Sequence, residues 1–74
     1  KDVLAVVLMR EVGGGRYRGS LRSKGDINVA RVAEHFGGGG HKNAAGLRVE
    51  GDWDEKEKEI VEALQKAIAK GLGE

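Results

Sequence analysis

The chain has 74 residues, a formal net charge of +1 and no cysteine. A chain of this length forms one domain at most, and it buries only about 60% of the surface that its unfolded form exposes. The composition excludes disulfides, thiolate metal cages and a long apolar membrane span, and it fits a cytoplasmic location, where thiols stay reduced. The start at "KDVLAVV" shows no signal-peptide pattern. It also lacks a methionine, which predicts that residues 1–74 are a single domain excised from a longer chain.

The beginning of the chain predicts a β-hairpin. Val3–Met9 is a continuous apolar run rich in β-branched residues, and seven residues suit a buried strand better than a helix. Glycines at 13–15 predict a turn. Residues 16–23 then alternate, with Tyr17, Gly19, Leu21 and Ser23 on one face and Arg16, Arg18, Ser20 and Arg22 on the other. We expect the two runs to pair as antiparallel strands.

A helical period follows in residues 27–36. Asn28 is a suitable N-cap, and Ile27 and Val32 are spaced to form a hydrophobic staple around it. Gly37 is a suitable residue to end the helix. The spacing therefore predicts a short capped helix directly before the glycine run.

The rest of the chain predicts a third strand and a second helix. Ala44–Glu50 alternates like a strand, and a helix is expected over residues 54–70. Asp54 and Glu57 form a plausible capping pair, and Gly71 marks the end. The expected apolar face of this helix consists of Ile60, Val61, Leu64, Ala67 and Ile68. The order β-β-α-β-α predicts an α+β fold in which two helices cover a small mixed sheet of about three strands.

Charge is unevenly distributed along the chain. Residues 1–50 carry nine Lys or Arg against five Asp or Glu, whereas residues 51–74 carry four against seven. An anionic ligand would be drawn to the basic part, which also holds the glycine run.

Gly37–Gly40 are followed at once by His41 and Lys42. Four consecutive glycines are costly to order, and a helix stop with a tight turn needs only one or two. We therefore favour the interpretation that a ligand approaches bare backbone, with successive N–H groups forming a concave anion nest. The run is not a P-loop, because it follows a helix and no Ser or Thr comes after Lys42.

The place of the run after a helix also limits its chemistry. A helix C-terminus carries partial negative charge and repels phosphate, so binding would depend on backbone donors and on cations. The candidates are His41, Lys42 and an arginine from elsewhere, of which Arg22 at the end of the second strand is the best placed. Arg16 and Arg18, near the hairpin turn, are expected to be solvated, and for Arg22 both interpretations stay open.

Other chemistry finds little support in the sequence. His35 and His41 lie six residues apart with no third ligand nearby, so no metal site is assigned to this chain. No Ser-His-Asp or Cys-His arrangement can be recognised. Tyr17 and Trp53 have the rings to stack on a base, but packing is the favoured role for each.

Two motifs together carry a resemblance to a known family. "GSLRS" (Gly19–Ser23) and "GGGGHKNAAG" (Gly37–Gly46) resemble the DHH-associated C-terminal domain of DHH-family phosphoesterases. The longer string "LRSKGDINVARVAEHFGGGGHKNAAG" is most similar to the bifunctional oligoribonucleases (nano-RNases) that also dephosphorylate 3′-phosphoadenosine 5′-phosphate (pAp). Related domains occur in RecJ-like single-strand exonucleases and in cyclic-dinucleotide phosphodiesterases.

The resemblance implies roles for particular residues. In such enzymes a separate DHH domain holds two Mn²⁺ ions and hydrolyses the phosphodiester, while the associated domain grips the nucleotide. Carried over by motif, the catalytic residue is His41, and the substrate-binding residues are Arg22, Ser23, Gly38, Gly39, Gly40, His41, Asn43 and Ala44. The chain lacks an Asp-His-His motif, so it is not expected to hydrolyse anything alone. Its expected partners are its own N-terminal DHH domain and short single-stranded RNA or mononucleotide phosphates, with no membrane.

Two other classes of function stay open at this stage. A free-standing single-stranded nucleic-acid module would use "GGGG" as the G-x-x-G loop of KH domains, which joins two helices. The strand-like alternation after Gly46 argues against that loop. A structural or dimerising domain without a ligand would leave the four glycines and Arg22 without a role.

Overall fold

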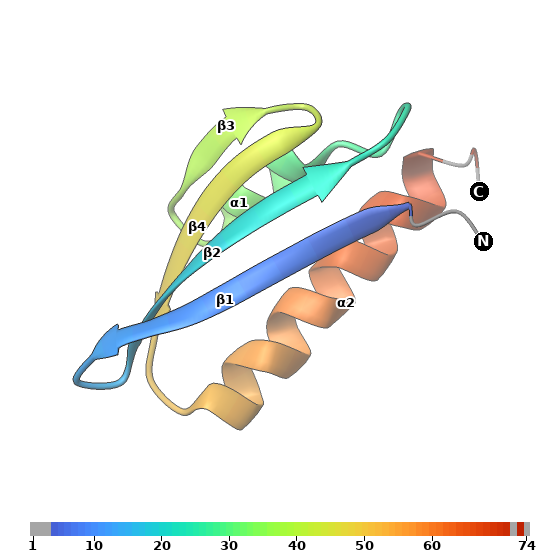
Figure 1. The fold of residues 1–74 in the computed structure, drawn as a ribbon. Coiled ribbons are helices and arrows are strands. Elements are labelled where there is room, and N and C mark those ends of the chain that lie inside the picture. The colour runs from blue at the N-terminus through green and yellow to red at the C-terminus, as the bar shows by residue number, and fades with distance from the viewer. Residues whose placement is uncertain (1–3, 72, 74) are drawn as a thin grey trace.

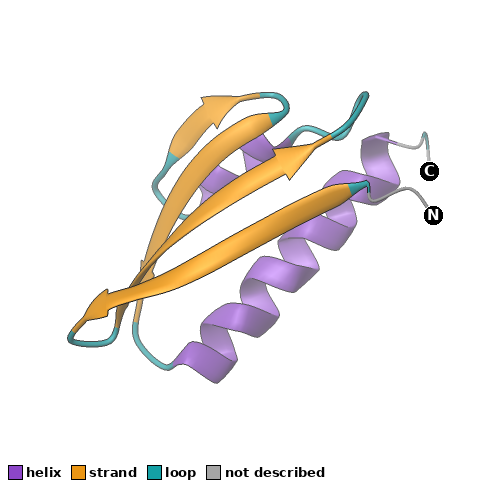
Figure 2. Cartoon of the chain, in the orientation of Figure 1, coloured by secondary structure: helices purple, strands orange, loops and turns teal. Residues whose placement is uncertain are grey.

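The computed structural model describes residues 4–71 and 73. In chain order the elements are β1 (Ala5–Gly13), β2 (Arg16–Ser23), α1 (Val29–His35), β3 (Gly39–His41), β4 (Ala44–Glu50) and α2 (Trp53–Gly71). The strands form one sheet in the order β1-β2-β4-β3, and each neighbouring pair is antiparallel. Both helices lie against the same face of this sheet, and the other face is bare (Figures 1 and 2).

The α+β class is confirmed, and the sheet differs from the prediction in two details. It has a fourth strand, β3, and its pairs are antiparallel rather than mixed. The fourth strand was missed because two of its three residues are glycines, which carry no side chains and so show no alternation.

The predicted hairpin and the division of its second strand into two faces are confirmed. Its first strand was expected to be buried, but β1 lies at the edge of the sheet, and Val6 and Leu8 on it are exposed. Leu21 is fully buried and Gly19 is buried, whereas Arg18, Ser20 and Arg22 are exposed. The register between β1 and β2 is regular from Ala5 to Glu11 and shifts before Gly13, where the turn begins. The hairpin therefore presents one apolar face to the helices and one face to solvent, on which the arginines and Ser20 of β2 lie beside the exposed Val6 and Leu8 of β1.

Helix α1 begins and ends as the sequence predicts. The Asn28 side chain accepts hydrogen bonds from the N–H groups of Ala30 and Arg31, at 3.0 and 3.3 Å. Ile27 and Val32, the expected staple, are 2% and 3% exposed and both belong to the core. Gly37 has φ +79° and ends the helix, because few other residues adopt this conformation.

Helix α2 differs from the prediction at its start and on its buried face. The cap is Asp52 and not Asp54, since Asp52 Oδ2 accepts a hydrogen bond from the N–H of Glu55 at 3.1 Å. Val61 is 41% exposed, so it was wrongly assigned to the buried face, whereas Ile60 is 2% exposed. Gly71, expected to follow the helix, is its last residue, and it lies so close to Ile27 that a Cβ atom would be 2.8 Å from that residue's Cα.

The core lies between the sheet and the two helices. Its buried hydrophobic residues are Leu21, Ile27, Val29, Ala30, Val32, Ala33, Ala45, Leu47, Val49 and Ile60. At the edge of the core, the rings of Tyr17 and Trp53 pack with their centroids 4.8 Å apart, which joins the start of α2 to the sheet. Among the described residues no helix is long and apolar enough to cross a membrane.

The corrected cap predicts a difference between two neighbouring aspartates. Asp52→Ala should lower the free energy of unfolding by about 1 kcal/mol, because it leaves the N–H of Glu55 without its acceptor. Asp54→Ala is the matched control and should cost less, about 0.3 kcal/mol, since Asp54 acts only through its charge in the first turn. Urea unfolding followed by circular dichroism measures both, and a larger loss for Asp54→Ala would contradict the assignment.

Candidate functional site

The bare face of the sheet, here called the outer face, gathers residues into rows that cross the strands. Residues directly opposite one another in antiparallel strands project to the same side. Val6 pairs with Arg22, Arg22 with Ala44, and Ala44 with His41. This set is called the histidine row. It brings together three residues that the motifs predicted, from strands β2, β4 and β3.

The geometry of the histidine row leaves space between Arg22 and His41. Neighbouring strands lie about 4.8 Å apart, so Arg22 and His41 are separated by about 10 Å with Ala44 between them. Ala44 has only a methyl group, and Arg22 and His41 are both exposed. The Arg22 guanidinium donates to the carbonyl of Leu21 at 3.0 Å, which orients it and leaves most of its donors free.

A second row beside it consists almost entirely of small residues. Leu8 pairs with Ser20, Ser20 with Gly46, and Gly46 with Gly39. This set is called the small row. Three of its members carry no more than a hydroxymethyl group, so the outer face is hollowed there.

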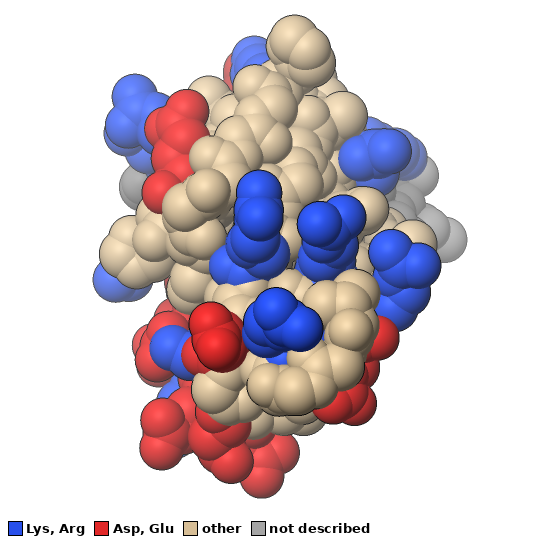
Figure 3. Space-filling model, turned by 90° about the vertical axis from the view of Figure 1, so that its left-hand side faces the viewer, with Lys and Arg blue, Asp and Glu red and all other residues tan. Residues whose placement is uncertain are grey.

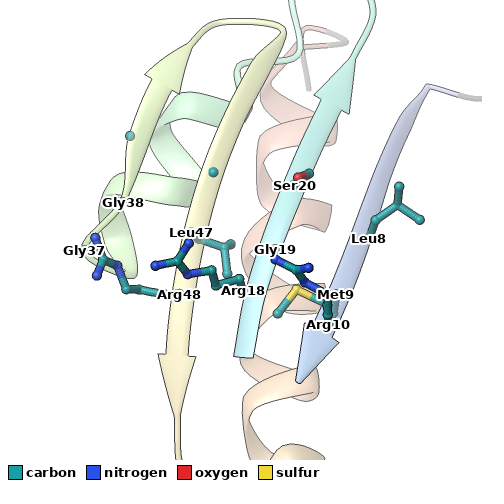
Figure 4. A pocket seen from close by; sticks show the side chains of 12 residues that line it. Leu8, Met9, Arg10, Arg18, Gly19, Ser20, Gly37, Gly38, Leu47 and Arg48 are labelled. Carbon is teal, nitrogen blue, oxygen red and sulfur yellow. The ribbon is translucent and has the colours of Figure 1, made fainter. Parts of the chain in front are cut away.

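A third row consists of arginines. Arg10 pairs with Arg18, and Arg18 with Arg48, so three guanidinium groups stand on adjacent strands (Figure 4). This set is called the arginine row. Together with the small row it lines a hollow of about 760 Å³, which also reaches the backbone of Gly37 and Gly38. This hollow on the outer face therefore lies beside the histidine row rather than over it.

The arginine row is the feature that sequence reasoning missed. Arg18 was assigned to solvent, and Arg10 and Arg48 were not considered. Each directly follows a less exposed residue in its strand, and that alternation is visible in the sequence. The pairing of β2 with β4 joins segments far apart in the chain, and no local pattern gives its register.

Charge is separated on the surface as well as along the chain. Figure 3 shows basic side chains side by side across the middle of one side of the molecule and most of the acidic ones below them, toward the start of α2 in Figure 1, with further acidic side chains at the upper left and beside the basic group. The first turn of α2 contains Asp54 and Glu55. No described residue after Arg48 lines the hollow beside the arginine row.

The structure separates the roles of the four glycines. Gly37 ends α1, and a Cβ atom on Gly38 would overlap the carbonyl oxygen of Gly46. A Cβ atom on Gly40 would lie 2.6 Å from the carbonyl oxygen of Ala44. Gly39 differs from the other three, since its φ is ordinary and a Cβ atom there would meet nothing within 4 Å. Three glycines thus satisfy the fold, and Gly39 is the one whose missing side chain leaves open space for a ligand.

The predicted anion nest is not formed at the start of the run. The N–H of Gly37 donates to the carbonyl of Glu34 at 3.1 Å, and the N–H of Gly38 donates to the carbonyl of Ala33 at 2.8 Å. These bonds close the end of α1, so both donors are already used. That interpretation of the first two glycines was wrong, because the helix end needs the same N–H groups.

Ser23 and Asn43 contact each other and hold a loop. Ser23 Oγ donates to the carbonyl of Ile27 at 2.6 Å, and Asn43 Nδ2 donates to Ser23 Oγ at 3.0 Å and to the carbonyl of Gly25 at 3.2 Å. Ser23 alternates with Arg22 and therefore projects to the opposite face of β2. The structure gives both side chains a positioning role, and direct contact with a substrate stays a prediction.

Lys42 is directed away from the histidine row. Its Nζ lies 2.8 Å from Asp26 Oδ1, and its side chain lines a second hollow, beside α1 and α2. The hydrogen bond and the positive charge of Lys42 lower the pKa of Asp26 below its ordinary value of 3.8. Of the cations proposed for a phosphate, His41 and Arg22 share a row and Lys42 does not. Among the described residues no three His, Cys, Asp or Glu side chains come together as a metal site.

Comparison with known proteins places the chain in a family. The DHHA1 domain family matches residues 1–70, and the chain belongs to this family. The resemblance carried by the two motifs is confirmed. The DHHA1 domain is a component of larger DHH proteins, in agreement with the expected partner domain.

Three known proteins show the range of similarity. The chain is 32% identical over 66 residues to the A-adding tRNA nucleotidyltransferase of Aquifex aeolicus, and the match covers 89% of the chain and 8% of that protein. It is 32% identical over 70 residues to the bifunctional oligoribonuclease and PAP phosphatase NrnA of Thermus thermophilus, with 93% and 21% covered. A crystal structure of an exopolyphosphatase-related protein from Bacteroides fragilis aligns with TM-score 0.60 and 41% identity, over 68% of the chain and 15% of that protein. The chain thus corresponds to a small part of each.

The different roles of adjacent glycines can be tested by stability. Gly38→Ala should lower the free energy of unfolding by about 1–3 kcal/mol, because the new Cβ atom would push β4 away from the end of α1. Gly39→Ala is the matched control and should leave stability unchanged or slightly raised, since its Cβ atom meets open space. Both are measured by urea unfolding, and equal losses at the two positions would refute the distinction.

Proposed function

We propose that this DHHA1 domain binds the phosphate of a nucleotide or short RNA in a phosphodiesterase that degrades short RNA or dephosphorylates pAp. The observation that carries the proposal is the register that places Arg22, Ala44 and His41 in one exposed row. An arginine fork and an imidazole N–H are both good donors to phosphate oxygens. Gly39, two residues before His41 on β3, lets a ribose or phosphate approach the backbone.

His41 is the proposed catalytic contribution of this chain. It stands on the edge strand β3, at the rim of the sheet, where a second domain has access to it. From there its ring can donate a hydrogen bond to a phosphate oxygen as negative charge develops on it. The Mn²⁺ ions that activate the attacking water would be held by the partner DHH domain, so the isolated chain binds substrate without cleaving it.

RNA is the substrate class that the similar proteins support. Two of them are named for action on RNA, as a tRNA nucleotidyltransferase and an oligoribonuclease. The KH-type alternative is disfavoured, because the glycine run joins α1 to strand β3 and not to a second helix. A RecJ-like exonuclease would use the same face with DNA, and binding of RNA and DNA tetramers distinguishes the two.

Binding at the histidine row is tested on the chain itself. Titration with pAp should shift the amide NMR signals of Gly39, His41 and Ala44, and Arg22→Gln should raise the dissociation constant about tenfold or more. Arg31→Gln, an exposed charge on α1, is the matched control and should change it less than twofold. Absence of shifts at millimolar pAp, or equal effects of the two variants, would refute the site.

The catalytic role is tested in the full enzyme that contains this domain. His41→Ala should lower kcat about 100-fold or more with a smaller change in KM, since it removes a donor that acts in the transition state. Arg22→Ala should mainly raise KM, because it removes binding common to ground and transition states. Unchanged kcat in the His41 variant, with Mn²⁺ saturating, would show that His41 takes no part in the chemistry.

A further inference from the structure

The arginine row has no explanation in the packing of the fold. Arg10, Arg18 and Arg48 stand directly opposite one another on strands about 4.8 Å apart, and like charges in such pairs destabilise a sheet. The ion pairs within the described residues are Lys42 with Asp26 and Lys56 with Glu59, so none of the three arginines has an acidic partner there. Three unneutralised guanidinium groups beside a hollow are suited to a ligand with more than one negative charge.

The distance between the arginine row and the histidine row determines how long a ligand must be to contact both. From Ala44 to Arg48 the strand advances four residues, which is about 13 Å. One phosphate group is too small to contact both rows. Between them lies the small row, where Ser20, Gly46 and Gly39 leave the backbone accessible.

We propose that the outer face binds a single-stranded oligonucleotide along the direction of the strands, with one phosphate at the histidine row and a later phosphate at the arginine row. The proposal rests on the proposed function and adds to it a second phosphate-binding position, which only an oligonucleotide can reach. In this arrangement the small row receives the sugar and backbone between the two phosphates. Binding then becomes tighter with substrate length, because a mononucleotide contacts only one row and an oligonucleotide contacts both.

The apolar side of the hollow favours an oligonucleotide over inorganic polyphosphate. Leu8, in the small row, is 69% exposed, and Val6, in the histidine row, is 41% exposed. Both lie on β1 and flank the path between the phosphate positions. Unpaired bases present flat apolar surfaces that these aliphatic side chains can contact, a role that aromatic side chains fill in many proteins that bind single strands. Inorganic polyphosphate has no group that would use them.

The test compares two ligands and two triple variants of the 74-residue chain. The ligands are AMP and the 5′-phosphorylated tetranucleotide pA₄, with affinities from NMR titration or calorimetry. The first variant is Arg10→Gln/Arg18→Gln/Arg48→Gln, and the control Arg31→Gln/Lys66→Gln/Lys70→Gln removes the same number of charges from residues around the hollow beside α1 and α2. Thermal unfolding verifies that both variants fold, and the first relieves repulsion between like charges.

The expected result is a length effect that depends on the arginine row. The unsubstituted chain should bind pA₄ about tenfold or more tightly than AMP, and the arginine-row variant should lose that advantage. The control should keep most of it. The salt dependence of pA₄ binding should also become shallower in the arginine-row variant, by about 0.7 in the logarithmic slope for each phosphate that the arginines no longer neutralise.

Other results would overturn the proposal in distinguishable ways. If AMP binds through Arg22 but pA₄ binds no better, the arginine row is not a subsite and the proposed function stands. If the control variant loses as much affinity for pA₄ as the arginine-row variant, the advantage of pA₄ over AMP comes from the overall positive charge of the chain and not from the arginine row. If inorganic tripolyphosphate matches pA₄ and depends on the same arginines, the row binds polyanions without preference for nucleic acid. If neither AMP nor pA₄ binds, the proposed function is refuted, and the proposal of a second phosphate position is refuted with it.

Discussion

The antiparallel register between β2 and β4 is the constraint on which the outer face depends. It joins the β1–β2 hairpin to the β3–β4 hairpin and so aligns residues from four strands into rows. The buried side fixes it, since Leu21 lies opposite Ala45 and Gly19 opposite Leu47. A slip by one residue would turn these core side chains to solvent and the arginines inward, so burial of the core also fixes the position of every charged group on the outer face.

A second set of contacts holds the short edge strand that carries His41. Strand β3 has only three residues and pairs on one side alone. The turn after it is tied to the start of α1 by the N–H of Val29, which donates to the carbonyl of Lys42 at 2.8 Å, and by the bonds of Asn43 to Ser23 and Gly25. These bonds restrict the histidine although they do not touch it. The motif residues around His41 can therefore matter to binding through its position.

Local patterns predicted most of the elements and little of the site. Alternation and period located both helices and three strands, and the cap at Asn28 was visible because its partners are two and three residues away. Near the start of α2 two aspartates, Asp52 and Asp54, are close together in the sequence. Only the hydrogen bond from the N–H of Glu55 identifies Asp52 as the N-cap. The meaning of the glycine run was hidden for a different reason. Composition shows that four glycines are costly, but only the approach of β4 distinguishes Gly38 from Gly39.

The arginine row lowers the stability of the free domain through repulsion between like charges, and this loss of stability points to a function. Burial of the core requires that residues 18 and 48 face solvent as a pair, but it does not require that both be arginine. Any neutral or oppositely charged pair would hold the sheet better. Seven of the twelve acidic residues lie after residue 51, and Glu50, which does lie opposite an arginine, pairs with Arg16 and not with a member of the arginine row. In the arrangement proposed above, a polyanionic ligand relieves this repulsion, so that the same charges that weaken the free domain strengthen binding at the outer face.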